Sequence, residues 1–366
     1  MKVICDRSAL VESLNLVGGV VVSRTPKPVL TCVKLTAESG GLTLAATDLE
    51  VAVHLTTPRV EVADQGQALV PADKLNQIVR ESVDPTLTLE TEKDLTHIKG
   101  QDSHFKLMGY PVGDFPPVPE FEGDADFEIV AGELHRLIAQ TIFATARENS
   151  RYAINGVLVD RDANKLSVVA TDGHRLAMAT GTCRAAGDGK RTAIVPTKAL
   201  QLLLRLLDDG EQTVRVKVAD NQILFATETA VLASNLVEGN FPPYKDVVPK
   251  DGDKKATLGT DILASAMRRA ALLTNEESKG VRLSFTKDGL TVTSRAPEMG
   301  EAEIGVECPK YDGDPIDIGF NPYYILDALK VADEDEITLE FKAPNKPGII
   351  KTGPNFLYVV MPVNLQ

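Results

Sequence analysis

Leu42-Thr43-Leu44 recurs as Leu166-Ser167-Val168 and again as Leu290-Thr291-Val292, and each triplet lies 124 positions after the one before it. The apolar alternation ahead of each triplet recurs at the same offset: Val33 and Leu35, Val157 and Val159, Val281 and Leu283. A third series precedes a short apolar helix in each copy: Val70-Pro71, Val195-Pro196 and Phe320-Asn321. A repeat of this length is a whole domain, because solenoid units have about 20–50 residues. The chain is therefore expected to contain three copies of one fold.

Length and charge fit this organisation. The 366 residues divide into three domains of ordinary size, for which we expect boundaries at 1–120, 127–245 and 246–366. Proline-rich segments at 114–119 and 240–244 end the first two copies, and stiff linkers would set neighbouring domains at a fixed angle, as in an arc. A net charge of −13 argues against a surface that is basic all over, but it allows a basic stripe on one face.

Several classes of protein are disfavoured by what the sequence lacks. The four cysteines form no CxxC pair, and the five histidines fall in different segments, so we expect neither a metal site nor a disulfide framework, and no cofactor. The first residues contain no secretory core, and no apolar run approaches the ~18 residues that span a bilayer. These features are typical of a soluble, reduced, cytoplasmic protein.

Each copy is expected to run in one order: a strand, an amphipathic helix, two or three strands, a second helix and closing strands. Val214, Val216 and Val218 alternate with polar residues, which is typical of an antiparallel sheet covered on one face. The fold class is therefore α+β.

The expected helices have basic residues opposite their apolar side. In the second copy a helix over 132–148 would place Leu134, Leu137 and Ile138 on one side, and Arg136, Gln140 and Arg147 on the other. The second helix of that copy places Lys198 and Arg205 on one flank. Lys74 and Arg80 on the second helix of the first copy do not share a face. Basic residues on one exposed helix are often merely solvated, but this explanation fits their recurrence in the three copies less well.

The densest polar cluster is Thr171-Asp172-Gly173-His174-Arg175-Leu176. An Asp two residues before a His allows acid–base catalysis. No nucleophile accompanies them, however, and the counterpart in the first copy, Thr47-Asp48-Leu49-Glu50, has no His. We therefore expect a tight turn, in which Asp172 accepts backbone N–H groups and Gly173 has a positive φ.

The C-terminal stretch from Tyr358 to Gln366 is unusually apolar for a chain end. Such a tail must be buried or form part of a binding groove, and the flexible side chain of Met361 suits a surface that accepts several apolar peptides.

Four motifs together resemble the bacterial sliding clamp family, the beta subunits of DNA polymerase III. They are Thr171-Asp172-Gly173-His174-Arg175-Leu176, Phe241-Pro242-Pro243-Tyr244, Gly319-Phe320-Asn321 and Val359-Val360-Met361-Pro362. The resemblance covers the whole chain in order.

The resemblance implies three tandem clamp domains per chain and a head-to-tail homodimeric ring, with helices lining the inner face and antiparallel sheets outside. The implied function is a processivity clamp without catalytic residues, metal or cofactor. Its partners would be duplex DNA, contacted through phosphates regardless of sequence, the replicative polymerase, an ATP-driven clamp loader and other proteins with a clamp-binding motif, and no membrane.

The resemblance also implies three sets of site residues. A partner-peptide groove between the second and third domains would use Ile154, Thr171, Gly173, His174, Arg175, Leu176, Pro242, Val247, Asn321, Tyr324, Val359, Val360, Met361, Pro362, Val363 and Leu365. The DNA contacts would be Arg24, Arg80, Arg147, Arg151, Tyr152 and Lys198. The ring joint would bring Phe105 of one chain against Leu272 and Leu273 of the other. Asp246, Ser278 and Asn364 depart from the family pattern in ways that bear on peptide preference.

Two alternatives remain open at this point. One is an enzyme that uses Asp172 and His174. The other is a peptide-binding scaffold that never encloses DNA, for which charge reversal at Arg147 and Lys198 would leave loading unaffected.

Overall fold

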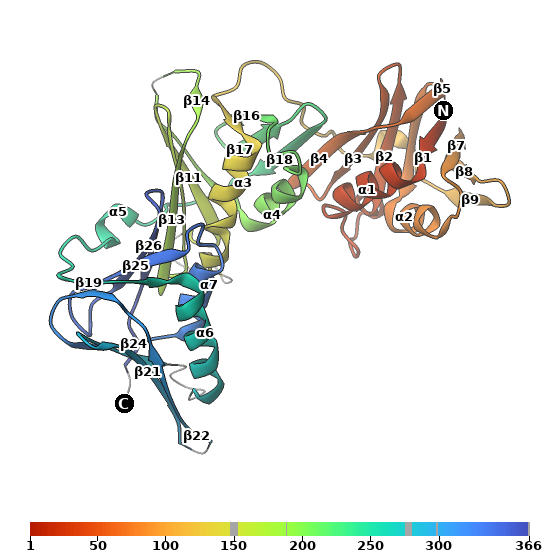
Figure 1. Ribbon diagram of the computed structural model, residues 1–366. Coiled ribbons are helices and arrows are strands. Elements are labelled where there is room, and N and C mark those ends of the chain that lie inside the picture. The colour runs from red at the N-terminus through yellow and green to blue at the C-terminus, as the bar shows by residue number, and fades with distance from the viewer. Residues whose placement is uncertain (147–152, 188, 275–279, 298, 365–366) are drawn as a thin grey trace. The chain divides into compact units, whose positions relative to one another are not determined.

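The computed structural model describes residues 1–146, 153–187, 189–274, 280–297 and 299–364 (Figure 1). By their internal contacts the residues form two compact units, which are described separately below. The first unit contains Met1–Gly132, Cys183–Gly187 and Lys198–Leu236, and the second contains Glu133–Thr182, Asp188–Thr197 and Val237–Gln366. Each unit contains strands from two neighbouring copies that pair with each other. The domain boundaries at 1–120, 127–245 and 246–366 stay a prediction.

The same order of elements occurs three times along the chain. The first copy has β1 (Lys2–Asp6), α1 (Arg7–Gly18), β2 (Cys32–Glu38), β3 (Gly41–Thr47), β4 (Val51–Thr57), β5 (Val60–Asp64), β6 (Gly66–Pro71), α2 (Ala72–Glu81), β7 (Thr86–Glu92), β8 (Leu95–Lys99) and β9 (His104–Met108). The second has β10 (Phe127–Val130), α3 (Ala131–Ala139), β11 (Gly156–Asp162), β12 (Lys165–Thr171), β13 (Arg175–Thr182), β14 (Arg184–Ala185), β15 (Arg191–Pro196), α4 (Thr197–Leu206), β16 (Thr213–Val218), β17 (Gln222–Ala226) and β18 (Ala230–Asn235).

The third copy follows a short connecting helix, α5 (Tyr244–Val247). It has β19 (Lys254–Gly259), α6 (Thr260–Ala270), β20 (Val281–Thr286), β21 (Gly289–Ala296), β22 (Gly300–Val306), β23 (Lys310–Asp312), β24 (Ile316–Phe320), α7 (Pro322–Leu329), β25 (Glu336–Phe341), β26 (Gly348–Thr352) and β27 (Phe356–Val360). The three repeated triplets lie in the equivalent strands β3, β12 and β21, so the threefold repeat is confirmed. The expected two or three strands between the helices are wrong, because each copy has five there.

The first unit contains two sheets. A five-stranded sheet has the order β5-β1-β7-β8-β9, and a nine-stranded sheet has the order β14-β10-β16-β17-β18-β4-β3-β2-β6. In the larger sheet β18 of the second copy pairs antiparallel with β4 of the first, from Ala230↔Leu55 to Ser234↔Val51. The proline-rich linker is therefore not alone in joining these copies, since main-chain hydrogen bonds cross their junction.

The second unit repeats this arrangement. Its nine-stranded sheet has the order β15-β11-β12-β13-β27-β26-β25-β19-β23, and its four-stranded sheet has the order β22-β21-β20-β24. β13 of the second copy pairs with β27 of the third, with Arg175 opposite Val360 and Leu176 opposite Val359. This register brings the polar cluster at 171–176 beside the C-terminal tail.

Two helices are capped by side chains, and the helices of each unit pack against its sheets. Asp6 caps α1 by accepting a hydrogen bond from the N–H of Ala9, and Asn321 caps α7 through the N–H of Tyr323, with Pro322 in the first turn. In the first unit α1 packs against α2 and against β3 and β4, and in the second unit α6 packs against α7 and against β21 and β22. Apolar faces such as Leu263, Met267 and Ala270 of α6 are fully buried.

The expected helix over 132–148 is too long. α3 ends at Ala139 and is followed by a 3-10 turn, Ile142–Ala144, because the buried Thr141 hydroxyl donates to the carbonyls of Leu137 and Ile138. Leu134, Leu137 and Ile138 are buried as predicted.

The predicted basic face of α3 is also wrong. Arg136 is bonded to Glu133, to Gln140 and to the carbonyl of Thr180, and Gln140 is itself buried and bonded to Asp333. The hydrogen bond to Glu133 raises the pKa of Arg136 above its ordinary value. Arg147, the third residue of that face, lies outside the described residues.

In the described part of the chain no helix is both long and apolar enough to cross a bilayer. The four cysteines are buried, and burial raises the pKa of the Cys5 thiol to about 12. In these same residue ranges no group of three or more His, Cys, Asp or Glu is arranged to hold a metal ion.

Candidate functional site

The segment from Thr171 to Arg175 forms a tight turn between β12 and β13. Asp172 Oδ1 accepts the N–H groups of His174 and Arg175 at 2.9 and 3.0 Å, and Thr171 Oγ1 donates to the carbonyl of Arg175 at 2.7 Å. Gly173 has φ +89°, a conformation that L side chains rarely adopt. The predicted turn is confirmed, including the roles of Asp172 and Gly173.

The first copy contains the same turn without the glycine. Asp48 Oδ1 accepts the N–H groups of Glu50 and Val51, Thr47 Oγ1 donates to the carbonyl of Val51, and Leu49 has φ +80°. The turn is therefore a property of the repeated fold. What distinguishes the second copy is the set of side chains that its turn presents.

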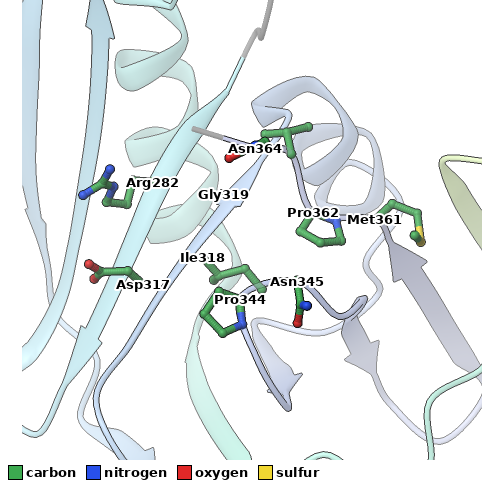
Figure 2. A pocket seen from close by; sticks show the side chains of 10 residues that line it. Arg282, Asp317, Ile318, Gly319, Pro344, Asn345, Met361, Pro362 and Asn364 are labelled. Carbon is green, nitrogen blue, oxygen red and sulfur yellow. The ribbon is translucent and has the colours of Figure 1, made fainter. Parts of the chain in front are cut away.

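The C-terminal tail is fixed beside this turn. The N–H of Met361 donates to the carbonyl of His174 at 2.9 Å, and the N–H of Val363 donates to the carbonyl of Gly319 at 2.9 Å. Figure 2 shows Met361, Pro362 and Asn364 along a hollow beside β24. Val359 and Val360 are buried, whereas the Met361 side chain is 40% exposed. The start of the tail is thus buried, and its side chains become exposed to solvent at Met361.

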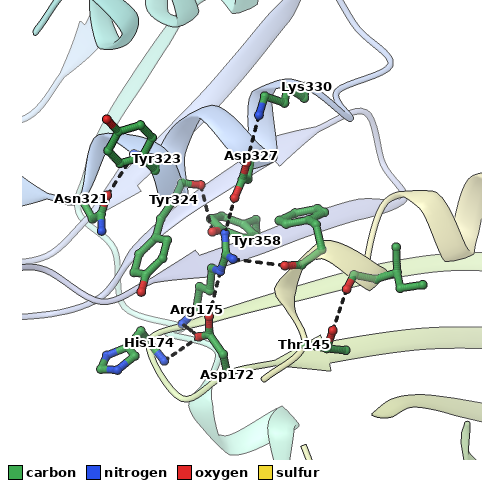
Figure 3. Close-up of polar contacts among 12 residues, drawn as sticks. Thr145, Asp172, His174, Arg175, Asn321, Tyr323, Tyr324, Asp327, Lys330 and Tyr358 are labelled. Atoms are coloured by element: carbon green, nitrogen blue, oxygen red, sulfur yellow. Dashed lines mark hydrogen bonds and ion pairs between the residues drawn. The ribbon is translucent and has the colours of Figure 1, made fainter. Parts of the chain in front are cut away.

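Arg175 connects the turn to α7 (Figure 3). Its Nε donates to Asp172 Oδ2 at 3.0 Å, its Nη1 to Asp327 Oδ2 at 2.7 Å and its Nη2 to the carbonyl of Phe143 at 3.1 Å. The guanidinium carbon also lies 4.5 Å from the centre of the Tyr324 ring, a cation–π distance.

The pKa values of Arg175 and Tyr358 are both shifted away from the physiological pH range. Burial lowers the pKa of Arg175, but its interactions with Asp327, Tyr358 and Asp172 together raise the pKa above the ordinary value. Burial raises the pKa of Tyr358, whose hydroxyl donates to the carbonyl of Tyr324. Arg175 therefore stays charged and Tyr358 neutral at all physiological pH values, so both act as structural donors.

Several predicted groove residues, two of them exposed and four half-buried, form a surface that we call the tail surface. The His174 and Tyr324 rings are stacked with centroids 6.4 Å apart, and Met361 is bonded to His174. The tail surface consists of His174, Asn321, Tyr324, Met361, Pro362 and Val363. Thr171, Gly173 and Arg175 support it from the turn.

The remaining predicted groove residues lie outside the tail surface, and four of them are buried in the core. Leu176 and Val359 are buried in one cluster with Leu158, Val169, Ile194 and Tyr244. The hydroxyl of Tyr244 donates to Asp160, which attaches the connecting helix α5 to β11. Pro242 is half-buried, Val247 is 45% exposed, and Ile154 and Val360 are buried. Leu365 and Ser278 lie outside the described residues, and Asp246 and Asn364 are exposed.

The predicted DNA contacts are only partly described. Arg24 and Arg80 are exposed, Arg80 in the last turn of α2, and Lys198 forms an ion pair with Asp48 while its side chain stays 47% exposed. All three belong to the first unit. Arg147, Arg151 and Tyr152 lie outside the described residues.

Two of the three predicted joint residues are exposed apolar side chains. Phe105 is 42% exposed on the edge strand β9, and Leu272 is 76% exposed in the 3-10 turn Ala271–Leu273. Leu273 is half-buried. Exposed apolar residues of this size on a strand edge commonly mark an interface.

Sequence reasoning missed Asp327, Phe143 and Tyr358, which hold Arg175 and Tyr324. One signal was available for Asp327: it follows Tyr324 by three positions, the spacing that places two helix residues on one face. No pattern in the sequence pointed to Phe143, which contributes through its carbonyl and ring.

The chain matches the three domains of one family over nearly its whole length. The N-terminal, central and C-terminal domains of the DNA polymerase III beta subunit match residues 1–119, 128–243 and 245–364. The chain belongs to the beta sliding clamp family.

The relatives span the full chain. The beta sliding clamp of Pseudomonas aeruginosa is 36% identical over 363 residues, which cover 98% of this chain and 99% of the relative. That of Escherichia coli K12 is 33% identical over 370 residues and covers all of both chains.

Solved clamp structures have the same fold. A sliding clamp from P. aeruginosa bound to griselimycin has 35% identity and a TM-score of 0.94, and one from Bacillus subtilis has 28% identity and a TM-score of 0.95. Each covers all of this chain and is itself fully covered. The chain is accordingly three tandem α+β clamp domains and a processivity subunit of DNA polymerase III rather than an enzyme.

The hydrogen bonds of the turn agree with this conclusion. A general base needs a free carboxylate, but Asp172 uses Oδ1 for two backbone N–H groups and Oδ2 for Arg175. The alternative of an enzyme that uses Asp172 and His174 is therefore not supported.

Proposed function

We propose that two copies of this chain close head to tail into a ring around duplex DNA and that partner proteins insert a peptide into a groove at the tail surface. Membership of the sliding clamp family carries this proposal. The replicative polymerase, the clamp loader and other proteins with a clamp-binding motif would compete for this groove in the cytoplasm.

The tail surface has the properties of a peptide site. Met361, Pro362 and Val363 offer apolar contact, His174 and Asn321 offer polar groups, and the ion pairs of Arg175 hold Tyr324 in place. Leu176, Val359 and Ile154 would form its floor, with Pro242 and Val247 at the rim. Griselimycin, to which the P. aeruginosa clamp is bound in its structure, is a ligand to be tested for competition at this site, with Met361→Ala as the variant that reports on the tail surface.

DNA would be held through phosphates by Arg24, Arg80, Arg147, Arg151, Tyr152 and Lys198. Contacts of this kind carry no base preference and weaken with salt, which suits a ring that slides. Charge reversal at Arg24 and Arg80 should shorten the residence time on circular DNA, and an unchanged residence time would speak for a scaffold that does not enclose DNA.

The ring would close by packing Phe105 of one chain against Leu272 and Leu273 of the other. Sedimentation at several concentrations tests this joint. We expect a dimer for the natural chain and a monomer for Phe105→Asp, whereas the same substitution at the exposed Val83 should leave a dimer. A dimer that survives Phe105→Asp and Leu272→Asp unchanged would exclude these residues from the joint.

A further inference from the structure

β24 is an edge strand with one unpaired side. Among the strands that the structure describes, β24 pairs with β20 alone, with Ile318 opposite Leu283 and Phe320 opposite Val281. The N–H and C=O of one strand residue point to the same side, and those of the next residue point to the opposite side. The carbonyl of Gly319 accepts from Val363, so the main-chain groups of Gly319 and Asp317 point away from β20.

The tail covers only the C-terminal end of this edge, at Gly319. Among the described residues Val363 alone bonds to the outer side of β24, through the Gly319 carbonyl. The N–H and C=O of Gly319 face the tail, whereas both main-chain groups of Asp317 have no strand partner among the described residues and remain for another strand. An unpaired edge of this kind is a template for an added strand.

A hollow of about 680 Å³ lies along this free edge (Figure 2). Its walls are Asp317, Ile318 and Gly319 on one side and Pro344, Asn345 and the tail residues 361–364 on the other, with Arg282 at the rim. Met361, Pro362 and Val363 belong both to this hollow and to the tail surface. The hollow is therefore a continuation of the proposed peptide groove.

We propose that this hollow binds an extended segment of the partner that runs on from the groove peptide and pairs with β24 as an added strand. The inference rests on the proposed peptide function and adds a second, main-chain recognition element to it. Strand addition of this type derives its affinity from main-chain hydrogen bonds.

The walls of the hollow favour pairing with β24 in particular. Pro344 and Pro362 have no N–H to donate, so β24 supplies the ladder while the prolines provide apolar contact. Arg282 lies opposite Gly319 in the sheet, and Asp317 is two residues away on the same face. One positive and one negative side chain give no net charge preference, so partners with different flanking sequences are accepted.

The first test changes only the peptide. The probes are an apolar pentapeptide that binds the chain in competition with griselimycin, the same peptide extended by Thr-Val-Thr-Val at either end, and extended peptides N-methylated at alternate amides. Calorimetry should show a roughly 3- to 10-fold tighter binding for an extension at one end, as expected for one or two net main-chain hydrogen bonds. N-methylation in one of the two alternating patterns should abolish the gain.

The second test changes the edge. Asp317→Pro removes an outward N–H at a position where an edge strand tolerates proline, and Asp317→Ala is its matched control. Asp317→Pro should cancel the gain from the extension and leave the affinity for the pentapeptide unchanged, whereas Asp317→Ala should keep the gain. If Asp317→Pro does not fold, as judged by its melting curve, the N-methylated peptides decide alone.

The two levels of the proposal fail separately. If Met361→Ala leaves the affinity for the pentapeptide unchanged, the peptide does not bind at the tail surface and the proposed function is wrong. If the pentapeptide binds there but neither extension increases its affinity, or N-methylation changes nothing, only the strand-addition inference is overturned.

Discussion

Arg175 of the second copy and Asp327 of the third form an ion pair in which Nη1 and Oδ2 lie 2.7 Å apart. The Arg175 side chain is 11% exposed, so the pair is largely shielded from water. The pair joins β13 to α7. Because the same guanidinium also lies over the Tyr324 ring, it positions the aromatic side chain of the tail surface.

Removal of this pair should destabilise the second unit. Asp327→Ala leaves a largely buried guanidinium with one carboxylate fewer, and we expect a loss of about 1–3 kcal/mol in the free energy of unfolding. Lys330→Ala is a matched control, because Lys330 contacts the same carboxylate but is 71% exposed. The control should cost less than about 0.5 kcal/mol in urea unfolding. Equal effects of the two substitutions would show that the Arg175–Asp327 pair has no special role.

The turn should depend on glycine at position 173. A Cβ at Gly173 meets no atom within 4 Å, so Gly173→Ala tests the backbone conformation alone. With φ at +89° we expect a loss of about 1 kcal/mol in stability. Gly305→Ala, also without a neighbour within 4 Å but with no positive φ, is the control and should be nearly neutral. Thermal unfolding of both variants measures the difference, and a neutral Gly173→Ala would contradict the strain argument.

The tail should supply binding energy for partner peptides. Truncation of Met361–Leu365 removes the exposed apolar wall and should weaken peptide binding by about 1–3 kcal/mol if these residues are hot spots. Met361→Ala should give part of this loss, and Val83→Ala, which changes a side chain that is 81% exposed in the first unit, should give none. An unchanged affinity of the truncated chain by calorimetry would refute the assignment.

Stability should fall in mild acid partly because of His54. Burial lowers the pKa of His54 below 6.5, while Glu120 opposes this effect by raising it. A lowered pKa means that the unfolded chain takes up the proton first, so the contribution is constant above pH 6.5 and is lost as the pH falls below it. The melting temperature of His54→Gln should therefore fall less between pH 7.5 and 5 than that of the natural chain or of His135→Gln. An identical fall in all three would exclude His54 as a cause.

The repeat, the α+β class and the turn at 171–176 could be predicted because they depend on local patterns. Offsets between apolar triplets, a glycine after an aspartate and the alternation of valines all report on single elements. The length of α3 could not be predicted in this way, since the helix ends where the Thr141 hydroxyl competes for its carbonyls.

The basic face of α3 was predicted wrongly for a similar reason. A helical wheel gives the side on which Arg136 lies but not its neighbours, and Glu133, Gln140 and the Thr180 carbonyl surround it. The partners of Arg175 likewise come from segments 32 and 152 positions away, which no local pattern records.

The two junctions between copies share this turn but differ in the side chains around it. The turn at Asp48 has the same hydrogen bonds, but Lys198 pairs with Asp48 where Arg175 pairs with Asp172. The position equivalent to Tyr324 in the second copy is Ala199, which is fully buried. The first junction therefore lacks the aromatic side chain that Arg175 positions at the second.

Retention on DNA circles tests the central claim most directly. The chain is loaded on a nicked circle, half of the sample is linearised with a restriction enzyme, and the half-life of the bound protein is measured in both halves at equal salt. A closed ring predicts a long half-life on the circle and rapid loss from the linear ends. Equal half-lives on the two substrates would contradict the account, because a protein held only by phosphate contacts does not distinguish a circle from a line.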